Sequence, residues 1–264
     1  NVGRYDLLTG YSKNIKPTIA DTTKLRFNWN APIAQDPFDT KTIYFGSQFL
    51  HKSTNNGDSW ELISPDLTTN DTSYQKQMES GGLTFDVTGA ENYTTLIAIA
   101  PSPVNKDVIW VGSDDGRLHL TKDGGLSWVS LEKKLPGMPE GAWIPQIHPS
   151  NHNADEAFVV VNDYRRNNWE PYLYHTTNGG KSWKQIASND DFSGYCLSVI
   201  QDPVEENLVF VGTENGLFVS FDKGENWNHW KHGYPNVSTM DMKIQEREGD
   251  LVIGTFGRAA YVLD

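Results

Sequence analysis

Three acidic residues lie directly before or close to glycines in predicted turns, and their carboxyl groups could act as acids or bases. Asp114 and Asp115 precede Gly116, and Glu214 lies shortly before Gly216. Hydrolysis of a glycosidic bond uses two carboxyl groups that flank the bond, one of them with a raised pKa. Asp114 and Glu214 are therefore the candidate catalytic residues. The alternative is structural, because acidic residues are common in tight turns of this kind.

A second group of residues combines cationic and aromatic side chains. The segment 162–170 holds Tyr164, Arg165, Arg166 and Trp169. This mixture suits stacking on a sugar or contact with a peptide, and arginine binds carboxylates in bidentate geometry. Further binding candidates are Asp115, Arg117 and Arg258. The alternative is that the arginines pair with acidic neighbours and that Trp169 packs onto its own strand.

The framework that must position these residues is indicated by an octapeptide that occurs four times. Its shared positions are a hydroxyl residue, Asp or Asn, Gly and Trp: Ser53, Asn55, Gly57 and Trp60; Thr121, Asp123, Gly125 and Trp128; Thr176, Asn178, Gly180 and Trp183; Ser220, Asp222, Gly224 and Trp227. The Asp or Asn side chain can bind nearby backbone N–H groups, and glycine allows a positive φ. The tryptophan opens the next strand and offers an apolar surface for packing. We call these four segments the repeat turns.

The surroundings of the repeat turns predict the fold. Apolar, strand-like segments precede them, as at 108–113, 157–162 and 208–213, and their tryptophans are 68, 55 and 44 residues apart. Short strands repeating every roughly 40–50 residues are typical of propeller blades. The sequence therefore predicts an all-β fold, a β-propeller of four-stranded antiparallel blades. With strands lettered a to d from the axis outward, each repeat turn joins strands c and d.

The predicted blades cover residues of about 23–63, 94–131, 142–186 and 196–230, with the innermost strand of the first blade at 25–30. Residues 238–264 offer three more strands. Two interpretations follow for the single domain 1–264. In one, residues 3–8 supply a fourth strand to the last blade and close a ring of about five blades. In the other, which we favour, the chain is a propeller fragment, part of a larger ring.

The repeat turns resemble the Asp-box (BNR) repeats of sialidases, family 74 glycoside hydrolases and sortilin/VPS10 propellers. Segments 142–174 and 257–264, with 4–10 and 27–30, are similar to a group of bacterial sortilin-like proteins. The resemblance implies the fold and leaves the activity open. In that group a strand such as 4–8 ends a preceding blade. In family 74 hydrolases a catalytic Asp lies in a turn similar to that of Asp114, and sialidases bind a substrate carboxylate with three arginines.

The blade order divides the connections between two faces. The a–b and c–d connections, with the repeat turns, lie on one face. The b–c and d–a connections lie on the other, which we call the b–c/d–a face; it holds 114–117, 162–170, Glu214, Arg258 and the long connection 64–93. Because binding residues are concentrated on loops that a rigid scaffold positions, this face is the candidate site.

Composition narrows the class of partner. The net charge of −12 and the isoelectric point near 5.0 argue against a nucleic-acid surface. No segment approaches the roughly 20 apolar residues of a membrane span. The single cysteine, Cys196, lies in an apolar strand, and no recognised His/Cys spacing occurs, so we predict no metal and no cofactor.

We therefore expect an exported protein, either secreted, on the cell surface or periplasmic, that binds a protein or glycan without catalysis. The runner-up function is a glycoside hydrolase related to family 74 or to sialidase-type propellers. A third hypothesis is a scaffold that holds adjoining domains or subunits together.

Overall fold

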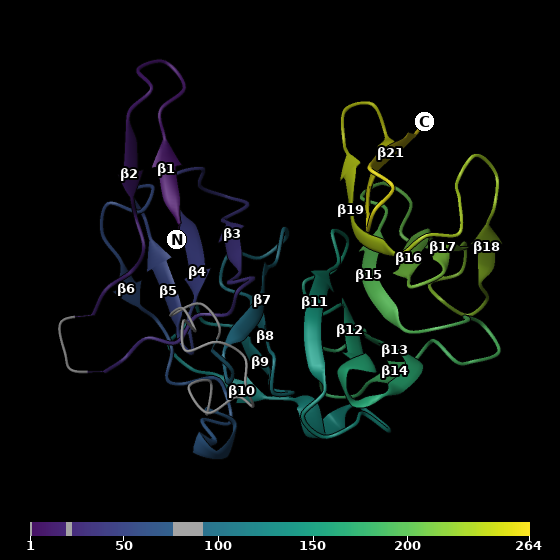
Figure 1. Ribbon diagram of the computed structural model, residues 1–264, viewed down its shortest axis with the longest axis horizontal. Helices are drawn as coiled ribbons and strands as arrows, with labels where there is room; N and C mark the ends of the chain where they lie inside the picture. Colours follow the sequence, from purple (N-terminus) through teal and green to yellow (C-terminus); the bar gives the residue numbers. More distant parts are fainter. Residues whose placement is uncertain (1, 20–22, 76–91) are drawn as a thin grey trace.

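The computed structural model describes residues 2–19, 23–75 and 92–264, and their regular structure is almost entirely antiparallel β-sheet. The sheets lie side by side in an arc that is open between β1–β2 and β19–β21, the arrangement of β-propeller blades (Figure 1). The N-terminal sheet is the pair β1 (Gly3–Tyr5) and β2 (Ser12–Asn14), and the C-terminal sheet has three strands, β19 (Thr239–Gln245), β20 (Asp250–Thr255) and β21 (Ala260–Leu263). Between them lie four four-stranded sheets. The first two consist of β3 (Ile33–Gln35), β4 (Ile43–Gly46), β5 (Leu50–Ser53) and β6 (Glu61–Leu62), and of β7 (Leu96–Pro101), β8 (Ile109–Ser113), β9 (Leu118–Thr121) and β10 (Val129–Ser130). The next two consist of β11 (Trp143–Pro149), β12 (Ala157–Asp163), β13 (Asn168–Thr176) and β14 (Lys184–Gln185), and of β15 (Cys196–Gln201), β16 (Val209–Thr213), β17 (Gly216–Ser220) and β18 (Asn228–Trp230). Short 3-10 helices are η1 (Thr72–Tyr74), η3 (Glu132–Lys134) and η4 (Tyr164–Arg166).

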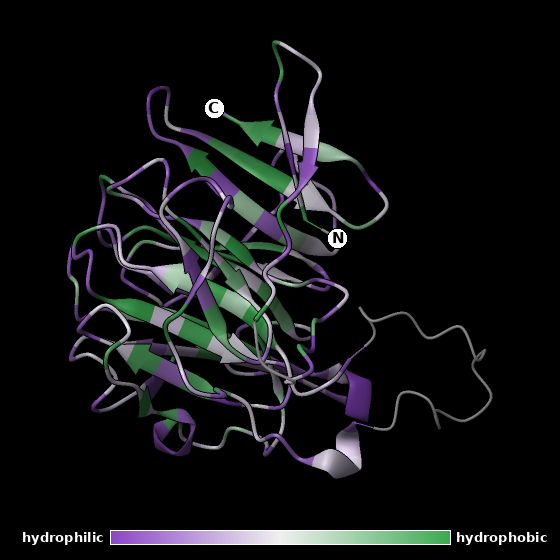
Figure 2. Cartoon of the chain, turned by 90° about the vertical axis from the view of Figure 1, so that its left-hand side faces the viewer, coloured by the Kyte–Doolittle hydropathy of each residue, from purple (hydrophilic) through white to green (hydrophobic). Residues whose placement is uncertain are grey.

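The hydrophobic core lies between consecutive sheets. Every residue of β8, β12 and β16 is buried, because the second strand of a sheet packs against neighbours on both faces. Trp110 and Trp183 meet edge to face in one of these layers, and Phe192 meets Phe218 in the next. Hydrophobic residues follow the strands, whereas the connections are largely hydrophilic (Figure 2). The packed sheets therefore position polar loops at both ends of their strands.

Each repeat turn is fixed by the same hydrogen bonds. Ser220 Oγ donates to Asp222 Oδ1 (2.7 Å) and accepts from the Gly224 N–H (2.8 Å), while Asp222 Oδ1 accepts from Asn226 N–H (2.8 Å). Equivalent bonds hold the other three turns. Gly224 has φ +88°, a conformation that favours glycine.

The repeat turns also join consecutive sheets. The indole N–H groups of Trp60, Trp128 and Trp227 donate to carbonyl oxygens of the preceding sheet's end, at 2.7, 3.0 and 2.7 Å. The acceptors are Ile15, Ile63 and Ile186. Among the described residues, Trp183 Nε1 has no partner. The equivalent carbonyl, that of Leu131, accepts instead from Lys134 N–H in η3 (2.9 Å).

The pairing of β1 with β2 differs from the ring-closing interpretation. β1 pairs with β2, and the C-terminal sheet has three strands. Ile15, just after β2, packs beneath Gly57 as Ile63 packs beneath Gly125. The pair β1–β2 therefore stands where the outer strands of a preceding sheet would stand, and residues 3–8 do not complete the last sheet.

The innermost strand of the first sheet also differs from the prediction. It is β3 (Ile33–Gln35), whereas residues 25–30 form no strand. The Arg26 N–H donates to the side chain of Gln48 (2.8 Å), and the Asn30 N–H donates to the side chain of Asn28 (3.0 Å). Side-chain acceptors thus replace strand pairing in this segment.

Candidate functional site

All the predicted acidic, basic and aromatic candidates lie in corresponding connections. Asp114, Asp115 and Arg117 lie between β8 and β9; Tyr164, Arg165 and Arg166 form η4, with Trp169 in β13; Glu214 lies between β16 and β17, and Arg258 between β20 and β21. Each is at a b–c connection of its sheet or, for Trp169, next to one. The b–c/d–a face is therefore their common location.

Asp114 is completely buried, and other residues occupy both of its carboxyl oxygens. Oδ1 accepts from the Thr95 N–H (2.8 Å), and Oδ2 accepts from Thr95 Oγ1 (2.6 Å) and Asn28 Nδ2 (3.0 Å). Burial raises the pKa of Asp114 to about 7. The side chain holds the segment before β3 against the start of β7, and it faces no open space where a ligand could reach it.

Asp115 fastens a different connection. Its Oδ2 accepts from Thr69 N–H (2.8 Å) and Thr69 Oγ1 (2.7 Å), and Oδ1 accepts from Ser113 Oγ (2.5 Å). These contacts bind the connection that follows β6 to the second four-stranded sheet. Both carboxylate oxygens of Asp115 therefore already accept hydrogen bonds from other residues of the protein.

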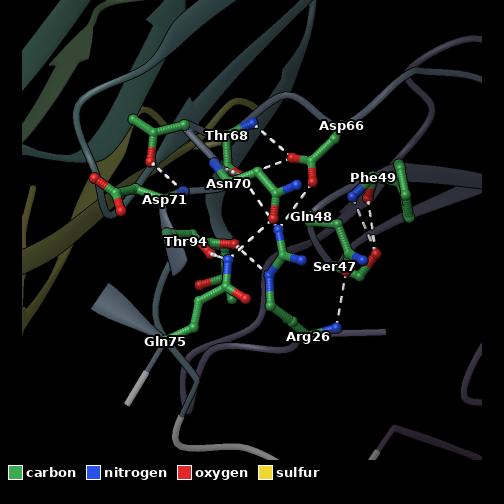
Figure 3. A network of polar contacts seen from close by, with 12 residues as sticks. Arg26, Ser47, Gln48, Phe49, Asp66, Thr68, Asn70, Asp71, Gln75 and Thr94 are labelled. Atoms are coloured by element: carbon green, nitrogen blue, oxygen red, sulfur yellow. Dashed lines mark hydrogen bonds and ion pairs between the residues drawn. The ribbon is translucent and has the colours of Figure 1, made fainter. Parts of the chain in front are cut away.

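A second network of polar contacts stabilises the connection that follows β6 (Figure 3). The Arg26 guanidinium donates to Asp66 Oδ2 (2.9 Å) and to the carbonyl of Thr94 (3.2 Å). Gln75 Nε2 donates to Asn70 Oδ1 and Thr94 Oγ1, both at 3.0 Å. Residues 64–75 are therefore held firmly, and residues 76–91 of the predicted connection 64–93 lie outside the described residues.

A row of aromatic rings extends along the described part of this face. The ring contacts run from Tyr74 to Tyr93 (5.5 Å between centroids) and from Tyr93 to Trp143 (6.4 Å). Beyond Arg165 they continue through Tyr164, Tyr195 and Trp169, with Tyr164 and Tyr195 stacked at 4.5 Å and Trp169 at 5.7 Å from Tyr195. We call these six rings the aromatic row.

Arg165 joins the two halves of the aromatic row. Its guanidinium carbon lies 3.5 Å from the Trp143 ring centroid and 4.4 Å from that of Tyr164. Both distances lie within the roughly 6 Å range of cation–π attraction. The guanidinium is consequently held between two ring systems that come from different parts of the chain.

Sequence reasoning assigned no binding role to four rings of the row, those of Tyr74, Tyr93, Trp143 and Tyr195. A signal was present in three consecutive sheets: Trp143 is the first residue of β11, Tyr195 directly precedes β15, and Tyr93 lies three residues before β7. A repeated aromatic at the d–a end of a blade places side chains side by side around the axis.

A hollow of about 310 Å³ lies beside the row at the centre of the face. Its walls come mainly from the innermost strands and η4, with one residue from the segment before β3 and one from β12: Asn30, Ile97, Trp143, Pro145, Gln146, Asn162, Tyr164, Arg165, Leu197, Met240 and Asp241. Gln146 bridges two strands, accepting from Val199 N–H (2.5 Å) and donating to Asp241 Oδ1 (3.3 Å). The hollow is near the lower size limit of small-molecule sites.

The remaining candidates lie around this centre. Arg117 pairs with Glu132 (2.6 Å) in a neighbouring hollow of about 380 Å³, and Arg166 pairs with Asp163 (2.5 Å). Glu214 lies beside Gly194 and has no hydrogen bond or ion pair with Asp114. Within residues 2–19, 23–75 and 92–264, no cluster of three His, Cys, Asp or Glu side chains could hold a metal ion.

Comparison with known proteins supports the fold more than any activity. No family model matches the chain. An oligoxyloglucan-reducing end-specific xyloglucanase of Emericella nidulans is 28% identical over 57% of this chain and 19% of its own length. A vacuolar protein sorting/targeting protein 10 of Lodderomyces elongisporus is 40% identical over 22% of this chain and 4% of its own.

Solved structures also support the fold, at lower sequence identity. An ancestral GH74 enzyme superposes on 89% of the chain with a TM-score of 0.61 and 20% identity. The extracellular domain of a putative one-component system from B. thetaiotaomicron superposes on 98% with a TM-score of 0.60 and 15% identity. The chain spans 29% of each of these proteins. In the described residues, no helix has the length and hydropathy of a membrane span. The fold is that of the β-propellers found in GH74 enzymes and in extracellular sensor domains.

Proposed function

We propose that this chain belongs to an exported, non-catalytic β-propeller that binds a glycan on its b–c/d–a face. The observation that carries the proposal is the aromatic row beside the central hollow, with Trp169 48% exposed at its end. Aromatic rings offer broad apolar surfaces that pack against the C–H faces of sugars, while neighbouring polar groups bind the hydroxyls.

The polar groups required for such a site border the same hollow. Asn30 and Asn162 contribute amides, and Asp241 contributes a carboxylate. Asn162 and Asp241 lie in the strands β12 and β19, and a hydrogen bond to Asn28 fixes the backbone of Asn30, so little conformational entropy is lost when a ligand binds. The extracellular location of the sensor domains with similar folds supports export.

A hydrolase is the second candidate function. It is favoured by the xyloglucanase similarity and by the pKa of Asp114 near 7, a value that suits a general acid. The complete burial of Asp114 and its bonds to Thr95 and Asn28 weigh against this role. A protein ligand on the same face is the remaining alternative, and the binding experiment below includes it.

The test measures binding of soluble polysaccharides and peptides by titration calorimetry, together with release of reducing sugar. We expect saccharide binding without sugar release, and a loss of affinity of roughly tenfold or more for Trp169→Ala, the size expected of an aromatic anchor. Phe221→Ala is the matched control, because Phe221 is an exposed ring in a c–d turn on the other face.

Three results would contradict the proposal. These are an absence of saccharide binding, equal affinities of Trp169→Ala and the unchanged protein, and sugar release that Asp114→Asn abolishes without unfolding the protein. The last result would establish the hydrolase instead.

A further inference from the structure

Arg165 differs from most arginines of the described chain in having no acidic partner. Five others lie within 3.0 Å of a carboxylate oxygen: Arg4, Arg26, Arg117, Arg166 and Arg247. Arg165 makes one long hydrogen bond, from Nη1 to Asn162 Oδ1 (3.4 Å). In a chain with a net charge of −12, an arginine without an acidic partner at the central hollow points to a partner from outside.

The geometry around Arg165 limits how a ligand can reach it. The guanidinium lies over the rings of Trp143 and Tyr164, and its Nη1 donates to Asn162 Oδ1, so the other N–H groups at its edge are left for a ligand. A guanidinium edge matches the two oxygens of a carboxylate, and a stacked guanidinium loses little freedom on binding. A carboxylate is therefore the group that fits this edge best.

A carboxylate in the wall of the hollow limits the rest of the ligand. Asp241 borders the same hollow, with its Oδ1 accepting from Gln146 Nε2 and from the Met242 N–H. Its negative charge, like that of the chain as a whole, opposes a ligand that carries many negative charges. Hydroxyl groups, in contrast, can donate to this carboxylate.

We propose that the central hollow binds a uronic acid residue set among neutral sugars, with the sugar carboxylate on Arg165 and hydroxyls toward Asp241. This inference rests on the proposed glycan-binding function and names the class of glycan. A uronic acid combines one carboxylate with several hydroxyls, which matches the cationic and anionic walls, and neighbouring neutral sugars can stack on the aromatic row.

The experiment compares two ligands that differ in one group. The first is a xylo-oligosaccharide with a single glucuronic acid branch, and the second is the same compound with its carboxyl reduced to an alcohol. Calorimetric titrations are made with the unchanged protein, Arg165→Gln, Arg165→Lys and the control Arg247→Gln, whose arginine is exposed in the β19–β20 turn. A thermal melt of each variant checks that it is folded.

We expect reduction of the carboxyl to weaken binding to the unchanged protein and to Arg247→Gln by about tenfold or more, the size of a charge-assisted bidentate contact. Arg165→Gln should bind both ligands with equal, weak affinity. Arg165→Lys should retain only part of the preference, because an ammonium lacks the planar pair of donors.

Equal binding of the two ligands by the unchanged protein would overturn the uronate assignment and leave the glycan-binding proposal standing. Binding of neither ligand, while peptides with a free C-terminal carboxylate bind through Arg165, would overturn both. If Arg165→Gln still prefers the acidic ligand, another group binds the carboxylate and the assignment to Arg165 is wrong.

Discussion

Side-chain oxygens serve different structural purposes on the two faces of the molecule. In the repeat turns, a hydroxyl and an Asp or Asn satisfy backbone N–H groups a few residues away. On the b–c/d–a face, Asp114 and Asp115 bind residues far away in the chain, at 28, 69 and 95. The first use can be seen in a short stretch of sequence, whereas the second depends on how distant segments pack.

The repeat turns yield a direct test at Thr121, which is buried. Its Oγ1 donates to Asp123 Oδ1 (2.7 Å) and accepts from the Gly125 N–H (2.9 Å). We expect Thr121→Ala to lower the free energy of unfolding by about 1–2 kcal/mol, because the Gly125 N–H loses its acceptor. Thr121→Ser is the matched control, since serine occupies this position in two other turns. Chemical denaturation measures both variants, and equal losses would show that the hydroxyl is not the stabilising group.

At the scale of elements, β1–β2 is attached to the first repeat turn through Ile15 and through the side chains of Arg4 and Lys13. Ile15 is buried against Gly57, and its carbonyl accepts from the Trp60 indole. Arg4 and Lys13 pair with Asp58 in the first repeat turn, but such exposed ion pairs contribute little. Apolar packing of one side chain therefore dominates the attachment of this pair of strands.

Ile15→Ala tests that attachment. Removing a buried isoleucine side chain should destabilise the docked position of β1–β2 by roughly 2–4 kcal/mol. We expect hydrogen exchange of the amides in the β1–β2 ladder to accelerate while amides of β12 keep their protection. Leu8→Ala, at a position 98% exposed in the β1–β2 connection, should leave exchange unchanged. Unaltered protection of β1–β2 in Ile15→Ala would mean that other contacts hold the strands.

The sequence predicted the sheets better than the site. The sheets follow from patterns of neighbouring residues, whereas the site depends on contacts between residues far apart in the chain. Turn residues and apolar strands lie within 10–20 residues of one another, so the propeller fold follows from local patterns. The innermost strand of the first sheet was predicted at 25–30, but there the Arg26 N–H binds the side chain of Gln48, a contact between residues far apart in the chain. Asp114 was predicted at the right turn, but its burial depends on Asn28 and Thr95.

At the scale of the whole molecule, the buried Asp114 links stability to pH. Its pKa in the folded protein is about 7, raised by burial from an ordinary value of 3.8, with Asp115 adding to the shift. Between pH 4 and pH 7 the folded protein therefore keeps a proton that the unfolded chain releases. The free energy of unfolding consequently falls as pH rises through this interval, and it levels off above pH 7.

Buried histidines have the opposite effect over the same interval. Burial lowers the pKa of His51 and of His148 to about 4, so the unfolded chain takes up protons below its usual histidine pKa of 6.5 while the folded protein does not. Their contribution to stability is therefore lost as pH falls. The pH dependence of the unchanged protein combines both signs, and only a comparison with a variant isolates the carboxyl.

Asp114→Asn provides that comparison, because the histidine contributions cancel in the difference between the two proteins. At pH 4 the variant should be the less stable, since its amide NH₂ must share the position at which Oδ2 accepts from Asn28 Nδ2. From pH 4 to pH 7 the difference should shift in favour of the variant by about 3 kcal/mol, most of what the pKa shift allows. Urea denaturation at several pH values measures it, with the exposed Asp190→Asn as control. A difference that stays constant with pH would mean that burial does not raise the pKa of Asp114 in the folded protein.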